Sequence, residues 1–202
     1  MIICMSDILC VTNRGLCGED FSTRIRKIAE ARPAGIILRE KDLAEEEYRE
    51  LARATIQICN KYGTPCILHS FVNVAKELGV KAIHLPLPVL RTLSKEDREE
   101  FTTIGASCHS VEDAIESERL GCTYITAGHV FDTDCKKGLP GRGLDFLQKV
   151  CESVAIPVYA IGGISEENFV EVIKAGANGA CVMSNAMTCE EPRKYFETFK
   201  ER

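Results

Sequence analysis

Short apolar runs alternate along the chain with longer segments in which apolar residues recur every three or four positions. The runs are rich in Ile, Leu, Val, Ala and Cys, which is typical of parallel strands that are buried on both faces. The longer segments have the spacing of amphipathic helices, and in the first of them Phe21, Ile25, Ile28 and Ala29 mark one apolar face. The pattern therefore predicts strands and helices that alternate along the chain.

Eight strands and eight helices follow from this pattern. The strands are expected at residues 8–13, 34–40, 66–69, 81–85, 103–108, 124–127, 156–161 and 179–183. The helices are expected at residues 21–31, 44–62, 71–78, 95–100, 111–120, 144–154, 166–175 and 190–199. Helix N-caps are expected at Asp20, Ser94, Ser110 and Ser165. Eight strand–helix units without a linker predict an α/β fold, a closed (β/α)8 TIM barrel, with residues 1–202 as a single domain.

Composition narrows the classes of function. The formal charge of −5 argues against a nucleic-acid partner and against a membrane-surface role. No apolar run approaches the roughly 20 residues that span a bilayer, and the apolar start of the chain is too short for a signal peptide. The cysteines number eleven, an odd count, and form no C-x-x-C pair. They indicate reduced thiols in a cytoplasmic protein, without a disulfide framework or a zinc site.

Polar residues follow most of the predicted strands, whereas the residues that begin the strands are apolar. The residues at these strand ends, most of them polar, are Asn13, Arg39–Glu40–Lys41, His69–Ser70, Pro86, Ser107 with His109, His129, Gly162–Gly163 and Ser184–Asn185. Barrel enzymes build their sites from the carboxyl ends of the strands. This contrast predicts a functional site at that end of the barrel.

Two groups among these strand ends suit an anionic ligand. Arg39 and Lys41 lie two residues apart, so they would point the same way if the strand continued past them. The alternative is an ion pair between these cations and Glu40 or another carboxylate. Gly162 and Gly163 precede a predicted helix start. Glycines at such a place let a ligand oxygen reach backbone N–H groups, and phosphate sites after the seventh and eighth strands are frequent in this fold.

The loop at residues 128–143 is the stretch richest in candidate chemistry. It begins with Gly128 and His129, carries Thr133 and Lys136, and contains four glycines. His129 is the candidate catalytic residue, because imidazole can take and give a proton near neutral pH. The alternatives are that His129 only positions a ligand by a hydrogen bond, or that the loop is an ordinary surface loop.

The other three histidines are weaker candidates. His84 lies before a strand end and is expected to be structural. His69 and His109 would either touch a ligand or only bond to neighbouring loops.

Several segments together resemble the thiamin phosphate synthase superfamily. They are residues 38–41, Ser107 with His109, residues 133–136, residues 160–164 and residues 182–184, and they stand in the family's order along nearly the whole chain. The resemblance implies a (β/α)8 barrel that handles thiazole phosphate and pyrimidine pyrophosphate. The site residues that it implies are Arg39, Lys41, Ser107, Thr133, Lys136, Gly162, Gly163, Met183 and Ser184.

The chain departs from the synthase pattern at two strand ends. Synthases carry Asn-Asp after the third strand, where this chain has His69–Ser70. They carry Gly-Gln and a nearby Asp after the fourth strand, where this chain has residues 85–89. The two aspartates that hold magnesium in synthases are absent, so we expect no metal and no other cofactor.

The loop at residues 128–143 instead resembles the thiazole tautomerase (TenI) branch of the superfamily. That resemblance implies an isomerase of thiamin biosynthesis, which aromatises the thiazole phosphate carboxylate tautomer by a proton shift through His129. The expected partner is a phosphorylated thiazole; the oligomeric state, a homo-oligomer included, is left open. The alternatives are a thiamin phosphate synthase and a non-catalytic regulatory protein that binds thiazole phosphate.

Overall fold

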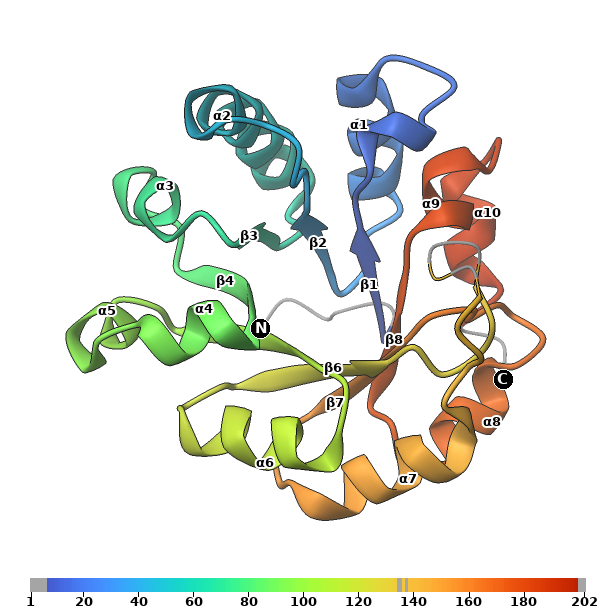
Figure 1. Ribbon diagram of the computed structural model, residues 1–202. Helices are drawn as coiled ribbons and strands as arrows, with labels where there is room; N and C mark the ends of the chain where they lie inside the picture. The colour runs from blue at the N-terminus through green and yellow to red at the C-terminus, as the bar shows by residue number, and fades with distance from the viewer. Residues whose placement is uncertain (1–6, 134–135, 137, 200–202) are drawn as a thin grey trace. The chain divides into compact units, whose positions relative to one another are not determined.

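The fold is a closed parallel barrel. The computed structural model describes residues 7–133, 136 and 138–199. Within these residues eight strands follow one another around the barrel in chain order, from β1 to β8. Helices lie between the strands in the sequence (Figure 1). The predicted α/β class and the (β/α)8 TIM barrel are confirmed.

The strands are short and mostly buried. They are β1 (Ile8–Val11), β2 (Gly35–Leu38), β3 (Cys66–His69), β4 (Ala82–Pro86), β5 (Thr103–Cys108), β6 (Tyr124–Gly128), β7 (Val158–Ile161) and β8 (Gly179–Val182). The helices are α1 (Phe21–Glu30), α2 (Glu45–Tyr62), α3 (Val72–Glu77), α4 (Leu87–Thr92), α5 (Lys95–Glu99), α6 (Val111–Arg119), α7 (Gly143–Ser153), α8 (Phe169–Lys174), α9 (Ser184–Thr188) and α10 (Pro192–Glu197). A 3₁₀ turn, η1 (Arg14–Leu16), follows β1.

The chain divides into two compact units. The first comprises Met1–Val80 and Val182–Arg202, and the second comprises Lys81–Cys181. In the first unit, Ile36 of β2 pairs with Cys10 of β1 and with Cys66 of β3. In the second unit, β5 lies between β4 and β6, and β6 pairs with β7.

Tyr48 shows how a helix fixes two strand ends in the first unit. Its side chain is fully buried. The hydroxyl donates to the Leu38 carbonyl oxygen at 2.7 Å and accepts from the His69 N–H at 2.9 Å. One side chain of α2 therefore satisfies backbone groups at the ends of both β2 and β3, which holds these ends in register.

Three short elements were not predicted: η1, α4 and α9. Each is six residues or fewer, which is too short for a periodic pattern to show. Pro88 lies in the first turn of α4, where its missing N–H has no helical partner to lose.

The N-caps test the predicted helix starts. Asp20, Ser94 and Ser110 each accept a hydrogen bond from the backbone N–H three residues later, as predicted. Ser165 was predicted as a cap and is not one. The helix α8 begins four residues later, after Asn168. The Asn168 side chain turns back and accepts from the Ser165 N–H at 3.0 Å.

Candidate functional site

In the second unit, Ser107 points away from the helices. Its neighbour Cys108 places its Sγ 3.3 Å from the Ser117 hydroxyl of α6. Successive side chains of a strand point to opposite faces, so Ser107 lies on the inner face of the sheet. There its hydroxyl is 2.9 Å from His84 Nε2. This predicted site residue is half-buried, near the carboxyl end of β5.

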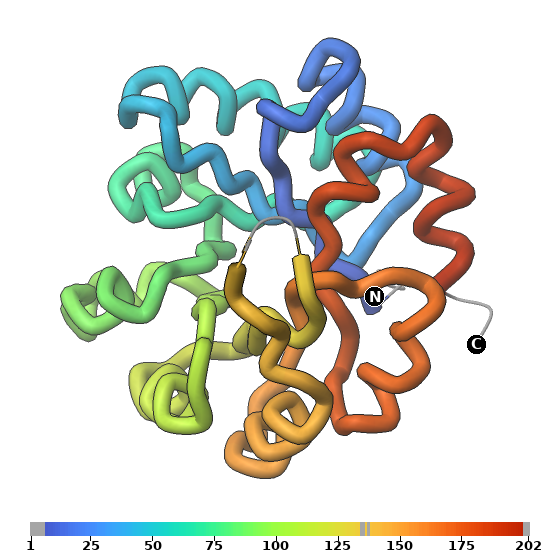
Figure 2. The backbone as a smooth tube through the Cα atoms, turned by 45° about the vertical axis from the view of Figure 1, so that its right-hand side comes forward, coloured from blue at the N-terminus to red at the C-terminus, as the bar shows by residue number. Residues whose placement is uncertain are grey.

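The loop at residues 128–143 is held at both ends. Its first limb pairs with β7, through Val130 N–H to the Ile161 carbonyl at 2.9 Å and Phe131 N–H to the Gly162 carbonyl at 3.0 Å. Its second limb returns to the first, where Gly143 N–H donates to the Val130 carbonyl at 2.9 Å. Figure 2 shows the two limbs side by side. Backbone hydrogen bonds therefore hold both limbs of the loop. Positions 134, 135 and 137 of the resembling segment lie outside the described residues.

His129 lies at the start of this loop and packs against Gly162. A Cβ atom on Gly162 would be 2.3 Å from the His129 Cβ, so only glycine fits there. His129 Nε2 is 3.2 Å from the Leu139 carbonyl oxygen. That oxygen can only accept, so Nε2 carries the proton of this hydrogen bond. The structure therefore brings together two predicted site residues, His129 and Gly162.

The glycines of this region are explained by close contacts. Gly162 and Gly163 have φ angles of +98° and +66°, which favour glycine. A Cβ atom on Gly163 would lie 2.5 Å from the Asp132 carbonyl oxygen. A Cβ atom on Gly128 would lie 2.2 Å from the Ile161 carbonyl oxygen. Gly128 thus permits the approach of β6 to β7. The predicted helix start at residue 166 is wrong, because α8 begins at Phe169.

His109 bonds to the start of the same loop. Its Nδ1 is 2.9 Å from the Gly128 carbonyl oxygen, and its backbone N–H donates to Asp113 at 2.8 Å. This contact supports the loop-bonding alternative for His109. Thr133 and Lys136 form a turn, in which Lys136 N–H donates to the Thr133 carbonyl at 3.0 Å, and the Lys136 side chain is exposed.

In the first unit, Arg39 and Lys41 follow the end of β2. The strand was predicted to run to residue 40 and ends at Leu38, so the condition under which Arg39 and Lys41 would point the same way is not met. Arg39 N–H donates to the Thr12 hydroxyl at 2.9 Å. Arg39 is half-buried and Lys41 is exposed.

Glu40, between these cations, is the best-satisfied carboxylate of this region. It is 3% exposed. It accepts from the Thr12 hydroxyl at 2.7 Å and from the Arg14 backbone N–H at 3.0 Å, and it pairs with Arg14 Nη1 at 3.4 Å. The ion pair that the structure shows for Glu40 is thus with Arg14, a residue that the sequence did not single out. Through these hydrogen bonds Glu40, which follows β2, connects to Thr12 and Arg14, which follow β1.

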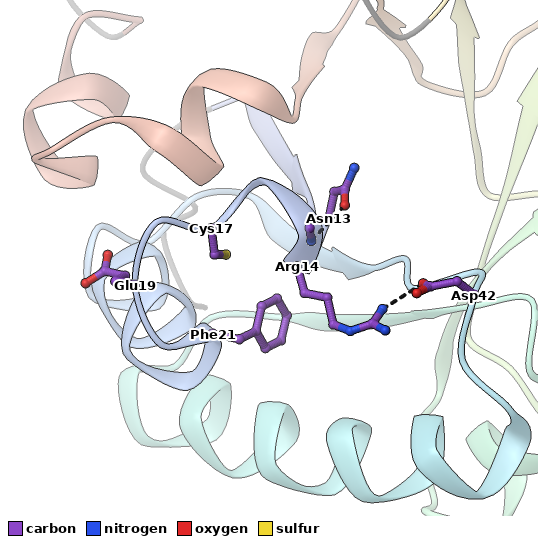
Figure 3. Close-up of a pocket in the computed structure, with 7 residues that line it drawn as sticks. Asn13, Arg14, Cys17, Glu19, Phe21 and Asp42 are labelled. Carbon is purple, nitrogen blue, oxygen red and sulfur yellow. Dashed lines mark hydrogen bonds and ion pairs between the residues drawn. The ribbon is translucent and has the colours of Figure 1, made fainter.

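A pocket of about 450 Å³ opens beside this network (Figure 3). The Arg14 guanidinium reaches from it to Asp42 at 2.7 Å. This hydrogen bond lowers the pKa of the exposed Asp42 carboxyl and raises that of Arg14. The lining residues are Asn13, Arg14, Gly15, Cys17, Glu19, Phe21 and Asp42. Among these residues only Asn13 was a candidate from the sequence. Arg14 was not, because an arginine in a loop gives no periodic signal.

Met183 and Ser184 lie where the chain leaves β8. Met183 is the N-cap residue of α9 and Ser184 is its first residue. Ser184 is exposed and Met183 half-buried. Backbone N–H groups at this turn remain candidates for contact with an anion.

The described residues do not form a metal site. Among residues 7–133, 136 and 138–199, no cluster of three or more His, Cys, Asp or Glu side chains could hold a metal ion. At the end of β3, Ser70 Oγ is 2.8 Å from His69 Nδ1. At the end of β4, Pro86 leads directly into α4. Neither of these two described strand ends supplies the carboxylate oxygens that magnesium prefers, so these residues do not fit a magnesium ion there.

The fold and these side chains define a TIM-barrel protein with polar groups at the carboxyl ends of its strands. A family model described as thiamine monophosphate synthase matches residues 8–186. The chain belongs to this family.

Individual relatives agree with the family assignment. A thiamine-phosphate synthase from Pyrococcus furiosus is 34% identical over 192 residues, which cover 95% of this chain and 91% of the relative. Another from Clostridium acetobutylicum is 33% identical over 174 residues, which cover 82% and 81%. The solved thiamine phosphate pyrophosphorylase from Pyrococcus furiosus has a TM-score of 0.82 at 31% identity, over 98% of this chain and 94% of that one.

These comparisons correct one expectation from the sequence. The chain was expected to be an isomerase of the thiazole tautomerase branch. The relatives above are named as synthases, which are transferases. The assignment to thiamin biosynthesis and to the superfamily is supported, and the isomerase assignment is wrong. The resemblance of the loop at residues 128–143 to the tautomerase branch is local, whereas the identity to a synthase extends over 95% of the chain.

No helix in the described part of the chain has both the length and the apolar character required to cross a membrane.

Proposed function

We propose that the protein is a transferase of the thiamine-phosphate synthase type. It joins a phosphorylated thiazole to hydroxymethylpyrimidine pyrophosphate. The thiazole nitrogen forms a bond to the pyrimidine methylene carbon, the bond from that carbon to the pyrophosphate oxygen breaks, and pyrophosphate leaves with the bonding electrons. The observation that carries the proposal is the 34% identity to a thiamine-phosphate synthase along 95% of the chain.

The residues at the strand ends are assigned roles within this proposal. In the first unit, Arg39 and Lys41 are assigned to supply positive charge to an anionic group of a substrate, and Met183 and Ser184 to supply backbone N–H groups. In the second unit, Lys136 is assigned to supply positive charge, Ser107 and Thr133 to supply hydroxyl groups, and Gly162 and Gly163 to supply backbone N–H groups to a phosphate. We keep the single domain and the cytoplasmic location as parts of the proposal.

His129 borders Gly162 and is assigned to the same phosphate region. Its acid–base role stays a prediction. Its Nε2 proton is directed at the Leu139 carbonyl oxygen, so a reaction step through this atom would require that hydrogen bond to break.

The proposal is tested by a coupling assay. The purified protein is incubated with thiazole phosphate and hydroxymethylpyrimidine pyrophosphate, with and without magnesium chloride, and thiamin phosphate is measured by fluorescence after oxidation to the thiochrome. We expect product that depends on the protein. In Ser107→Ala we expect kcat/KM to fall by about 10- to 1,000-fold, because one hydrogen-bond donor to a developing anion is lost.

Ser153→Ala is the matched control, since this hydroxyl only donates to the Val150 carbonyl at 2.8 Å within α7. It should leave kcat/KM unchanged. A folded protein that forms no thiamin phosphate under either condition would contradict the proposal.

A second candidate is a protein that binds the phosphorylated thiazole without catalysis. The observation that favours it is the lack of carboxylates at the ends of β3 and β4, where His69–Ser70 and Pro86 stand. Binding of thiazole phosphate in calorimetry, together with no product in the coupling assay, would support this candidate over the transferase.

A further inference from the structure

Three polar side chains meet on the inner face of the second unit. His84 of β4, Ser107 of β5 and Tyr124 of β6 come from adjacent strands. The Tyr124 hydroxyl is 3.0 Å from His84 Nδ1, and the Ser107 hydroxyl is 2.9 Å from His84 Nε2. His84 is 3% exposed and Tyr124 is 6% exposed. The imidazole thus bridges a buried phenol and a half-buried serine.

Gly105 makes room for this arrangement. It faces the same side of the sheet as Ser107, two residues further along β5. A Cβ atom on Gly105 would lie 2.1 Å from Tyr124 Cζ and 2.5 Å from His84 Nδ1. The φ angle of Gly105 is not among the positive ones, so the glycine serves the contact and not a turn. A side chain at position 105 would occupy the space in which Tyr124 contacts His84.

The direction of the hydrogen bonds follows from the tyrosine. Among the described residues, His84 Nδ1 is the only hydrogen-bond partner of the Tyr124 hydroxyl. Burial raises the pKa of Tyr124 well above its ordinary value, so the phenol keeps its proton. A buried O–H needs an acceptor, and Nδ1 is the one within reach. Nδ1 must therefore be the unprotonated nitrogen of a neutral imidazole.

The remaining proton of the ring then lies on Nε2 and points at Ser107. A neutral imidazole has one N–H group. Nε2 donates to the Ser107 oxygen, so the Ser107 O–H proton is not used by the histidine. In the opposite arrangement, Nδ1 would donate to the phenol oxygen and the phenol proton would be buried without an acceptor.

We infer that Tyr124 and His84 are positioning residues, which orient the Ser107 hydroxyl so that it donates its proton outward to a bound anion. The inference deepens the proposed function and rests on it for the identity of that anion, a phosphate or pyrophosphate group. His84 was expected to be structural. Its hydrogen bonds to Tyr124 and Ser107 instead determine in which direction the Ser107 hydroxyl can donate.

The first test observes the tautomer directly and does not depend on any ligand. In ¹⁵N-labelled protein, long-range ¹H–¹⁵N correlation spectra separate an imidazole protonated at Nε2 from one protonated at Nδ1. The resonances of His84 are assigned with His84→Asn. At pH 7.5 we expect His84 protonated at Nε2 alone. Protonation at Nδ1, or at both nitrogens, would overturn the inference.

The second test asks whether Tyr124 acts on a ligand through Ser107. Binding of inorganic pyrophosphate is measured by calorimetry for the wild type, Tyr124→Phe, Ser107→Ala and the double variant. We expect Ser107→Ala to weaken binding by about tenfold or more. We expect Tyr124→Phe to weaken it by about two- to tenfold, because the ring can then adopt either tautomer. The double variant should bind no more weakly than Ser107→Ala alone.

Tyr159→Phe is the matched control. The ring of Tyr159 packs edge-on against the ring of Tyr124, with 5.8 Å between the centroids. Tyr159→Phe removes a phenol hydroxyl from the neighbouring strand and leaves the hydrogen bond between Tyr124 and His84 in place. Any change that it causes should be equal in the wild type and in Ser107→Ala. Additive effects of Tyr124→Phe and Ser107→Ala would overturn the inference. A wild type that does not bind pyrophosphate would instead count against the proposed function, while the tautomer measurement still decides the direction of the hydrogen bonds.

Discussion

At the scale of single residues, close contacts explain why particular residue types occur at several strand ends. Gly128, Gly162 and Gly163 are required because strands and loop limbs approach within the reach of a Cβ atom. Glu40 is buried because Thr12 and Arg14 satisfy its oxygens. All four residues lie at the carboxyl end of a strand, next to or among the predicted site residues.

The contact at Gly105 predicts a large effect of a small change. In Gly105→Ala the added methyl group would overlap the Tyr124 ring and His84. Overpacking of a core costs about 1–3 kcal/mol of unfolding free energy, which urea denaturation measures. Gly18→Ala is the control, because nothing lies within 4 Å of its Cβ position. Equal stability of the two variants would contradict the packing at Gly105.

The network around Glu40 predicts a difference between two carboxylates that share Arg14. In Glu40→Ala the Thr12 hydroxyl and the Arg14 N–H lose a buried acceptor, which costs about 1–3 kcal/mol. The Asp42 side chain is 69% exposed. In Asp42→Ala water replaces it, so the unfolding free energy should change far less. Thermal denaturation of both variants tests the difference, and a larger loss in Asp42→Ala would refute it.

At the scale of elements, the local signals of helix starts were accurate where a side chain had no competing partner. Asp20, Ser94 and Ser110 cap their helices. Ser165 has the same residue type before a helical pattern. However, the Asn168 side chain holds this segment in a turn. Its amide oxygen accepts from the Ser165 N–H at 3.0 Å, and its amide nitrogen donates to the Gly163 carbonyl oxygen at 2.9 Å. The turn after β7 thereby uses the residues that the sequence assigned to a helix.

This difference predicts unequal effects of two serine substitutions. Ser110→Ala removes the acceptor of the Asp113 N–H at 3.0 Å and should cost about 0.5–2 kcal/mol. Ser165→Ala removes a side chain that caps no helix and should change stability by less than about 0.5 kcal/mol. Urea denaturation of the two variants compares them directly. A comparable loss in Ser165→Ala would show that this serine caps a helix after all.

At the scale of the whole molecule, five of the nine described cysteines are buried and act as core residues. The nine cysteines in the described residues are free thiols. Several lie in the strands and in the turns between elements, among them Cys10, Cys108, Cys122 and Cys181. Cys108 packs between a strand and a helix, since its Sγ lies 3.3 Å from the Ser117 hydroxyl of α6. Buried thiols of this kind act as small apolar side chains of the core.

Buried thiols predict how stability depends on alkaline pH. Burial raises the pKa of Cys108 to about 11 and that of Cys122 to about 12, from an ordinary value near 9. Below pH 9 the thiols are protonated in both states, so the stabilising effect is fully present there. Above pH 9 the unfolded chain releases protons that the folded protein keeps. The unfolding free energy therefore falls as the pH rises from about 9 to 11, by up to about 1.4 kcal/mol per pH unit for each thiol.

Cys122→Ala isolates the contribution of one thiol. Urea denaturation at pH 8, 9 and 10 should give a shallower decline for this variant than for the wild type. Parallel curves would contradict a raised pKa of Cys122 in the folded protein.

The sequence by itself determined the order of strands and helices, the closed barrel and most of the helix caps. These depend on periodic burial and on hydrogen bonds between near neighbours, which are written locally in the chain. Only the tertiary structure decided which partner each polar side chain takes. Arg14 reaches Glu40 across 26 positions, and Tyr124 reaches His84 across 40. No local pattern encodes these contacts, because they arise when separate strands are packed side by side. The orientation of Ser107 follows from such a contact.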